Sequence, residues 1–122
     1  MKKFTEIKKL PEFEKEFKKL LKKFQSLEED LDVFIDKQLV LTHKLGVDNG
    51  GVVRIAGLGI EEPKVYKAKK FACKALKGKG AQSGIRIIYS YSSTRDVVEF
   101  IEIYYKGDKE NEDRARIVGQ YR

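Results

Sequence analysis

The first third of the chain carries an apolar residue at every third or fourth position. On a helix of 3.6 residues per turn, this spacing places the apolar side chains on one stripe. The stripe consists of Phe13, Phe17, Leu20, Leu21, Phe24, Leu27, Leu31, Phe34 and Ile35. Pro11 suits a first helical turn, and Ser26-Leu27-Glu28-Glu29 is a capping-box sequence that begins a second helix. We therefore predict two helices, about 12–24 and 27–44, forming an antiparallel hairpin; one long kinked helix is the alternative.

Three segments of the second half are rich in β-branched and aromatic residues, as strands are. They are Val65–Leu76, Ile85–Ser92 and Val97–Tyr105. The turns between them are short, which predicts antiparallel neighbours. Both faces of Ile85–Tyr91 are apolar, as in a central strand that is covered on both sides. The alternation slips within Val65–Leu76, and a β-bulge near Lys70 would restore it.

The remaining segments carry weaker signals. Lys3–Lys8 is predicted as a short strand, and Gly46–Glu62, with its five glycines, as a loop or a loosely held extended segment. This segment matches neither the P-loop nor the dinucleotide-binding pattern. The tail, Asn111–Arg122, is charged and weakly helical in pattern. We predict one α+β domain over residues 1–122: a short N-terminal strand, a two-helix hairpin and a three-stranded antiparallel meander, with the helices on one face of the sheet.

The amino-acid composition excludes several classes of protein. With 41% hydrophobic and 37% charged residues in 122, the chain has enough apolar content for one modest core. A single cysteine cannot form an internal disulfide or a zinc finger, and a single histidine excludes a histidine-rich metal site. We expect no metal and no small-molecule cofactor. No apolar run approaches the roughly 20 residues of a membrane span, and no signal h-region follows the basic Met1-Lys2-Lys3-Phe4, so a cytoplasmic location is expected.

The positive charge is concentrated in the middle of the chain. The net charge is +7, and residues 46–95 carry ten basic but only three acidic side chains. From Lys64 to Arg86 there is no acid at all. The cations of this stretch are Lys64, Lys67, Lys69, Lys70, Lys74, Lys77, Lys79 and Arg86. Such a field concentrates phosphate and predicts salt-dependent binding to nucleic acid, whereas a merely solvated basic surface is the alternative.

Three of these cations have the spacing of a catalytic cluster. Lys67 and Lys69 project from the same face of an extended strand, and Arg86 lies on the next strand. Cleavage of a phosphodiester by 2′-hydroxyl attack needs a base for the hydroxyl proton and a cation for the phosphorane. A lysine crowded by other cations has a lowered pKa, which suits a base, and an arginine fork suits phosphate oxygens. A solvated cationic face is the alternative interpretation.

Four local motifs follow one another between residues 54 and 111. They are Arg54-Ile55-Ala56-Gly57-Leu58-Gly59, Val65-Tyr66-Lys67-Ala68-Lys69-Lys70, Gly78-Lys79-Gly80 followed by Ser83-Gly84-Ile85-Arg86-Ile87-Ile88-Tyr89, and Ile103-Tyr104-Tyr105-Lys106-Gly107-Asp108-Lys109-Glu110-Asn111. Together with the predicted order of elements, they resemble the RelE/ParE superfamily of toxins from type II toxin–antitoxin systems. The last motif resembles the RelE/HigB branch in particular.

This resemblance implies a toxin that cleaves mRNA in the ribosomal A site, with a cognate antitoxin, the ribosome and mRNA as partners. Lys67 and Lys69 match the strand lysines of acid–base chemistry and phosphate contact, and Arg86 matches the arginine that stabilises the transition state. Lys106 and Lys109, at the end of the last strand, and Lys79, in the glycine-rich turn, are the further phosphate-binding candidates.

The chain also departs from the family pattern. Gly107 stands near the position of an arginine beyond the last strand, Asp113 near that of a tyrosine, and Ile85 replaces an aromatic residue. A non-catalytic or degenerate relative that binds RNA, the ribosome or, as the ParE branch does, gyrase is therefore a second hypothesis. A general basic RNA-binding domain with a stacking sheet is a third.

Several other residues carry plainer expectations. His43 is expected as a capping or surface residue near the end of the second helix, and Cys73 as a small buried hydrophobe. Tyr89 and Tyr91 are expected to pack under the helices. Tyr104 and Tyr105 point to opposite faces of their strand, which predicts one in the core and one exposed, and either could stack on a base.

Overall fold

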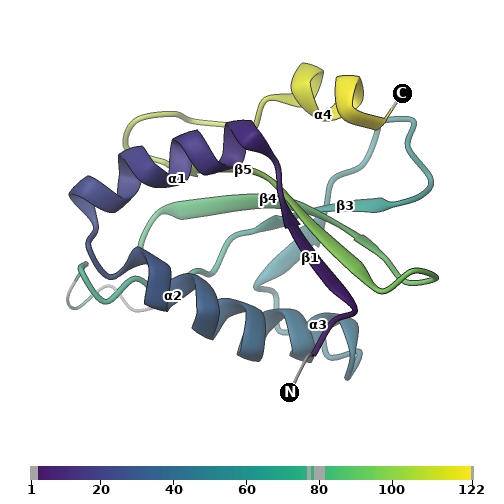
Figure 1. The fold of residues 1–122 in the computed structure, drawn as a ribbon, viewed down its shortest axis with the longest axis horizontal. Helices are drawn as coiled ribbons and strands as arrows, with labels where there is room; N and C mark the ends of the chain where they lie inside the picture. Colours follow the sequence, from purple (N-terminus) through teal and green to yellow (C-terminus); the bar gives the residue numbers. More distant parts are fainter. Residues whose placement is uncertain (1–2, 77, 79–81, 122) are drawn as a thin grey trace.

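The computed structural model describes residues 3–76, 78 and 82–121. Its strands are β1 (Glu6–Lys9), β2 (Val52–Arg54), β3 (Lys64–Ala68), β4 (Ile85–Ser92) and β5 (Val97–Tyr105). Its helices are α1 (Pro11–Lys23), α2 (Leu27–Phe34), a π-helical turn η1 (Ile35–Leu39), α3 (Val40–His43) and α4 (Arg114–Tyr121). Figure 1 shows α1 and α2 lying across the sheet, with α4 near the C-terminal end of the chain. The predicted α+β class is confirmed.

The sheet has five strands in the order β1-β5-β4-β3-β2. The predicted antiparallel meander of β3, β4 and β5 forms its centre, and β1 pairs with β5 in parallel. The additional strand is β2, which pairs antiparallel with β3 inside the segment predicted as a loop or loose extended chain. Three residues between glycines give too weak a signal for a strand, and the pairing with β3 supplies the order that the local sequence lacks.

The predicted strand Val65–Leu76 is too long. β3 ends at Ala68, and just beyond it the N–H groups of Lys69 and Lys70 both donate to the Gly51 carbonyl. Two adjacent N–H groups on one carbonyl form the hydrogen-bond pattern of a β-bulge, as predicted near Lys70, and the chain then leaves the sheet. A separate register shift lies between β4 and β5, at the step from Ile88 to Tyr89.

The two predicted helices are confirmed, with the second divided into α2, η1 and α3. Ser26 stands before α2 as expected, but its hydroxyl does not cap the helix backbone. It donates to the Asp30 carboxylate at 2.6 Å and accepts the Ala75 N–H at 2.8 Å, which ties the start of α2 to the chain after β3. The helix begins where the sequence indicates, through a different set of hydrogen bonds.

The sheet is covered on both faces, which corrects the expectation of helices on one face only. The odd-numbered residues of β4, such as Ile87 and Tyr89, pack into the core beneath α1 and α2, and this side is called the helical face below. Ile88 faces the other way, into a second core with Ile117 of α4 and Tyr104 of β5. We call this second side the charged face, for the ionisable groups that it carries.

Three of the plainer expectations concern the helical face. Cys73 is 3% exposed, as expected of a small buried hydrophobe, and burial raises the pKa of its thiol. His43 is half-buried and packs against tyrosines: its ring stacks on Tyr91 at 4.4 Å, and its Nε2 forms a 2.8 Å hydrogen bond with the Tyr89 hydroxyl. Tyr89 and Tyr91 pack under the helices as expected.

Candidate functional site on the charged face

The site is built on the register of the three central strands. Lys67 of β3 is the direct partner of Ile88 of β4, and Ile88 is the direct partner of Glu102 of β5. Directly paired residues share a face of a sheet, so a cation and an anion flank Ile88 in one row across the charged face. In the next row Arg86 of β4 is paired with Tyr104 of β5.

Each charge of the first row is neutralised by the segment that follows β5. Lys67 forms an ion pair with Glu112, with Nζ and Oε1 3.3 Å apart and side chains only 15% and 12% exposed. Glu102 is completely buried, and it accepts hydrogen bonds from the Lys109 ammonium and from the Asp113 N–H. The sequence predicted other cations around Lys67, whereas the charged partner in the structure is a carboxylate. A buried pair of this kind is stable only while both partners remain.

Arg86 and Lys69 meet at the edge of this site. The Arg86 guanidinium donates a 3.0 Å hydrogen bond to the Lys69 carbonyl, just beyond the end of β3. The Lys69 side chain is exposed. The register therefore places Lys67 and Arg86 on adjoining strands, and Lys69 lies just beyond the end of β3. Lys67 lies beneath Glu112, whereas Lys69 is open to solvent.

Tyr104 is the unusual member of the site. It is 5% exposed, and its hydroxyl has no hydrogen-bond partner among the residues that the structure describes. Burial raises the pKa of the Tyr104 hydroxyl, and the nearby Lys67 ammonium offsets part of that rise. The two groups are thus neighbours, although no well-formed hydrogen bond joins them. A buried hydroxyl without a partner costs free energy unless another group comes to satisfy it.

The segment after β5 is fastened across the charged face by further polar contacts. Arg116 of α4 forms a two-pronged ion pair with Glu16 of α1, at 2.8 and 3.0 Å, and also donates to the Ile101 carbonyl. The Tyr121 hydroxyl donates to Glu99 at 2.6 Å. We call residues 106–121 the C-terminal strap, since they cross the charged face from β5 to the end of α4.

Of the predicted phosphate-binding residues, Lys109 belongs to the site through Glu102, and its ammonium lies 5.5 Å from the centre of the Tyr104 ring. Lys106 is exposed, and its N–H donates to the Gly84 carbonyl just before β4. Lys79 lies outside the described residues.

Glu102 and Glu112 were missed in the sequence. Glu102 had a signal, because an acid between Ile101 and Ile103 in a largely apolar strand needs a partner. Glu112 had none, because 45 positions separate it from Lys67.

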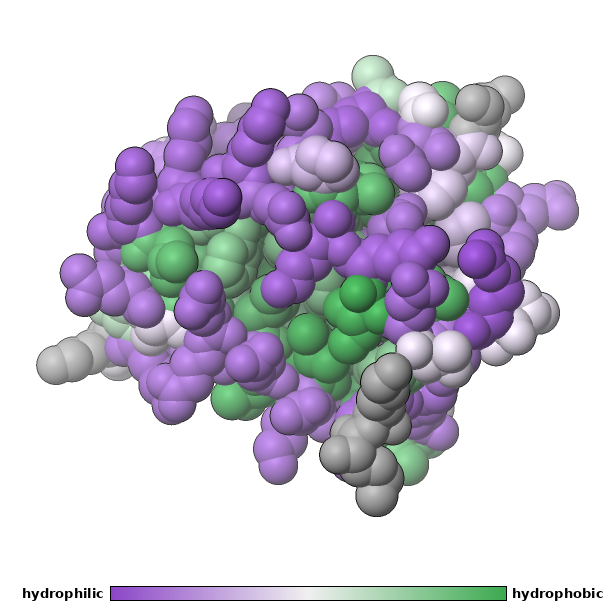
Figure 2. Space-filling model, in the orientation of Figure 1, coloured by the Kyte–Doolittle hydropathy of each residue, from purple (hydrophilic) through white to green (hydrophobic). Residues whose placement is uncertain are grey.

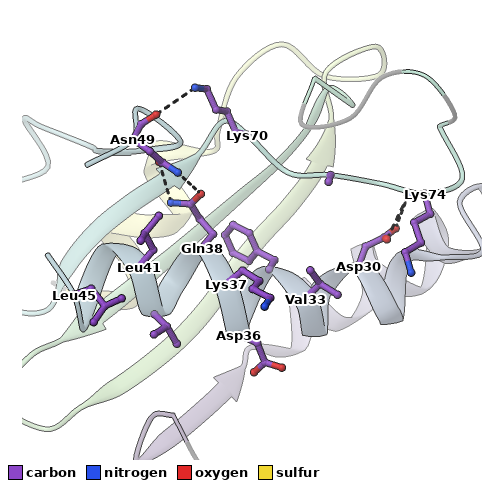
Figure 3. A pocket seen from close by; sticks show the side chains of 13 residues that line it. Asp30, Val33, Asp36, Lys37, Gln38, Leu41, Leu45, Asn49, Lys70 and Lys74 are labelled. Atoms are coloured by element: carbon purple, nitrogen blue, oxygen red, sulfur yellow. Dashed lines mark hydrogen bonds between the residues drawn. The ribbon is translucent and has the colours of Figure 1, made fainter. Parts of the chain in front are cut away.

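A hollow lies away from the charged face, beside α2 and α3 (Figure 3). Its volume is about 610 Å³, and its apolar lining includes Val33 and Leu45, which are 45% and 67% exposed. Lys37, Lys70 and Lys74 also line it. Gln38 and Asn49 are joined by hydrogen bonds at one end, and Asp30 accepts the Lys74 N–H at the other. Figure 2 shows further apolar surface between the polar side chains on the side of α1 and α2.

Within the described residues, no group of three or more His, Cys, Asp or Glu side chains is placed to hold a metal ion. None of the helices in that part of the chain has the length and apolarity to cross a membrane.

No protein-family model matches the chain, and no curated protein sequence matches it. Among solved structures, the chain is similar to a chain of the archaeal RelE–RelB complex from Pyrococcus horikoshii OT3, with a TM-score of 0.49 and 17% sequence identity. That alignment covers 84% of this chain and 94% of the other. At this identity most side chains differ, so the roles of individual residues have to come from this chain's own geometry.

Proposed function

We propose that this protein is the toxin of a toxin–antitoxin module and an endoribonuclease that cleaves mRNA on the ribosome. The observation that carries the proposal is the register of β3 and β4, with the hydrogen bond from Arg86 to the Lys69 carbonyl. It gathers cations from an acid-free stretch of the chain onto adjoining strands. The ordered motifs quoted above, which resemble those of the RelE/HigB branch, give this cluster its proposed chemistry.

In the proposed reaction the RNA 2′-hydroxyl attacks the adjacent phosphorus. One lysine of the pair Lys67 and Lys69 acts as the base for the hydroxyl proton, and Arg86 neutralises the charge that builds on the phosphorane oxygens. The bond from phosphorus to the 5′-oxygen breaks, and that oxygen takes a proton from the other lysine of the pair, which acts as the acid. The products are a 2′,3′-cyclic phosphate and a free 5′-hydroxyl, so no water, metal or cofactor is consumed.

The test is cleavage of ribosome-bound mRNA by the purified protein. We expect Arg86→Ala to lower the rate by about 10²–10³-fold, as loss of a transition-state donor does, and the triple variant with Lys67→Ala and Lys69→Ala to fall to background. Lys64→Ala is the matched control, because Lys64 lies on β3 but at the far end and on the other face. Equal cleavage by wild type and triple variant would end the proposal.

The proposal requires an antitoxin, and we propose that an acidic amphipathic segment of it occupies the hollow beside α2 and α3. The exposed apolar lining and the lysines there match the apolar and acidic faces of such a segment. A reading frame for an acidic protein next to this gene is the candidate. Its product should bind the wild type and bind Leu45→Glu at least tenfold more weakly, whereas Lys15→Glu on the outer face of α1 should bind nearly as well.

A non-catalytic relative on the same scaffold is the second candidate. The ion pair between Lys67 and Glu112, together with Gly107 and Asp113 at the departures from the family pattern, favours it. Such a protein would bind RNA, the ribosome or gyrase without cutting RNA. Translation-inhibition and gyrase-inhibition assays with the same preparation separate the two candidates.

A further inference from the structure

The Glu112 carboxylate lies where an anion contacts Lys67, over a sheet face whose other groups are arranged to receive one. We propose that Lys67 and Tyr104 form a seat for an RNA phosphate, and that Glu112 occupies this seat in the free protein as an internal competitor. The inference rests on the proposed function for the identity of the ligand as RNA. It adds a binding residue, Tyr104, and an inhibitory residue, Glu112.

In the part of the chain that the structure describes, the Tyr104 hydroxyl lacks a hydrogen-bond partner that a phosphate could supply. The Tyr104 hydroxyl is buried beside Lys67 and donates to no acceptor within the described residues. Glu112 reaches Lys67 at 3.3 Å through one oxygen, and it forms no hydrogen bond with Tyr104. An RNA phosphodiester presents two non-bridging oxygens on a tetrahedral phosphorus, so one oxygen can accept from Lys67 while the other accepts from Tyr104.

Arg86 adds a third donor to the seat. Because Arg86 is the direct partner of Tyr104 across β4 and β5, its side chain leaves the same face of the sheet, one strand spacing of about 4.8 Å away. A phosphate at the seat therefore lies between a lysine, a tyrosine hydroxyl and an arginine. These are the donor types that proteins use for phosphodiesters.

The Glu112 side chain is placed so that it can move away from Lys67. Glu112 lies in the connection between β5 and α4, outside any helix or strand. Within the described residues, the polar contact of its side chain is the ion pair with Lys67, whereas the strap is held on either side of it by Lys109 with Glu102 and by Arg116 with Glu16. Glu112 can therefore withdraw while the strap stays in place.

The experiment measures binding of the full chain to a single-stranded 2′-O-methyl RNA oligonucleotide, which cannot be cleaved by 2′-hydroxyl attack. If the closed form is favoured about tenfold, Glu112→Gln raises the apparent affinity by about tenfold. Glu110→Gln is the matched control, since it removes the same charge from an exposed neighbour. It should raise the affinity by about twofold or less, through long-range charge alone.

Tyr104→Phe tests the other half of the seat. In the Glu112→Gln background it should lower the affinity by about fivefold, as loss of one hydrogen bond to a charged group does. In the wild-type background the seat is closed, and the effect should be smaller. Thermal unfolding of each variant shows that it is folded before it is titrated.

Equal affinities of Glu112→Gln and Glu110→Gln would overturn the inference. So would an unchanged affinity on adding Tyr104→Phe to Glu112→Gln. These results are separable from the proposed function, because binding needs no chemistry. A gain in affinity without any mRNA cleavage would contradict the proposed nuclease activity and support the phosphate seat. Cleavage without the gain in affinity would support the nuclease activity and contradict the seat.

Discussion

The two faces of the sheet are closed by different physical means. The helical face is sealed by side chains such as Phe13, Leu27 and Phe100, all fully buried, and by an aromatic cluster around His43. The charged face has a smaller apolar core, and the C-terminal strap is fastened over it by ion pairs and hydrogen bonds. Apolar burial makes the first closure strong and insensitive to ligands, whereas the second competes directly with any anion that binds.

This difference indicates where each task of the molecule is carried out. A face closed by apolar packing sets the stability of the fold, and its residues can be exchanged only for others of similar volume. A face closed by paired charges can open locally at small cost and exchange one partner for another. We therefore expect substitutions on the helical face to act on global unfolding, and those on the charged face to act on local opening and binding.

The largest effect is expected from Phe13→Ala on the helical face. Phe13 is fully buried, and its ring stacks on Phe100 with centroids 5.2 Å apart. Truncation leaves a cavity, so the free energy of unfolding should fall by about 3–5 kcal/mol, measured by urea denaturation. Phe17→Ala, one turn later and only partly buried, should cost clearly less. Equal losses at the two positions would contradict this assignment of the core.

A smaller effect on the same face depends on pH. Burial lowers the pKa of His43 from 6.5 to about 4. Between these values the unfolded chain binds the proton more readily than the folded protein. The contribution of neutral His43 to the free energy of unfolding is therefore complete above pH 6.5 and is lost as the pH falls towards 4. With allowance for partial exposure, the loss is about 2 kcal/mol. His43→Phe keeps the ring stacking, and its unfolding free energy should vary less with pH in that window; parallel curves for the two proteins would refute the prediction.

Next in size is Tyr121→Phe at the end of the C-terminal strap. It removes the hydrogen bonds to Glu99 and Ser90, at 2.6 and 2.7 Å. The cost should be about 1 kcal/mol and should be local. Amide hydrogen exchange in α4 should accelerate by about fivefold while exchange in β4 stays unchanged. Equal acceleration in both elements would show that the strap and the sheet open as one unit.

The smallest effect is expected at the exposed pair of Lys15 and Glu12 on the outer side of α1. Their side chains are 76% and 62% exposed, and the charged atoms are 3.6 Å apart. Lys15→Ala should change the free energy of unfolding by less than about 0.5 kcal/mol, within the error of most urea titrations. A loss of 1 kcal/mol or more would mean that surface charge contributes to the helical face as well.

Periodic patterns made most of the elements predictable. The stripe from Phe13 to Ile35 identified both helices, and β4 was identifiable as a central strand because apolar residues occupy both of its faces. β2 was not, since three residues between glycines become a strand only against β3. The end of β3 was misjudged for a related reason: Phe71 and Cys73 continue the apolar character of the strand, but they pack under the helices after the chain has left the sheet.

The site was predictable only as a set of cations. Alternation was enough to place Lys67 and Lys69 on one face of an extended segment, whereas placing Arg86 beside them needed the register between β3 and β4. The partners of these cations come from residues far along the chain, and charge alone could not pair Glu112 with Lys67. Likewise, the lone His43 looked like a surface residue because the tyrosines that enclose it, Tyr66, Tyr89 and Tyr91, belong to strands that follow much later.

The parallel pairing of β1 with β5 has a consequence for biosynthesis. Glu6 lies opposite Val97, so the first strand to be translated has no neighbour in the sheet until the last strand has been made. Between those events the apolar side of α1 has only α2 to pack against, because its main contact in the finished molecule is β5. Completion of the sheet must therefore wait until β5 has left the exit tunnel, and a truncated product that stops before β5 should be an aggregation-prone species.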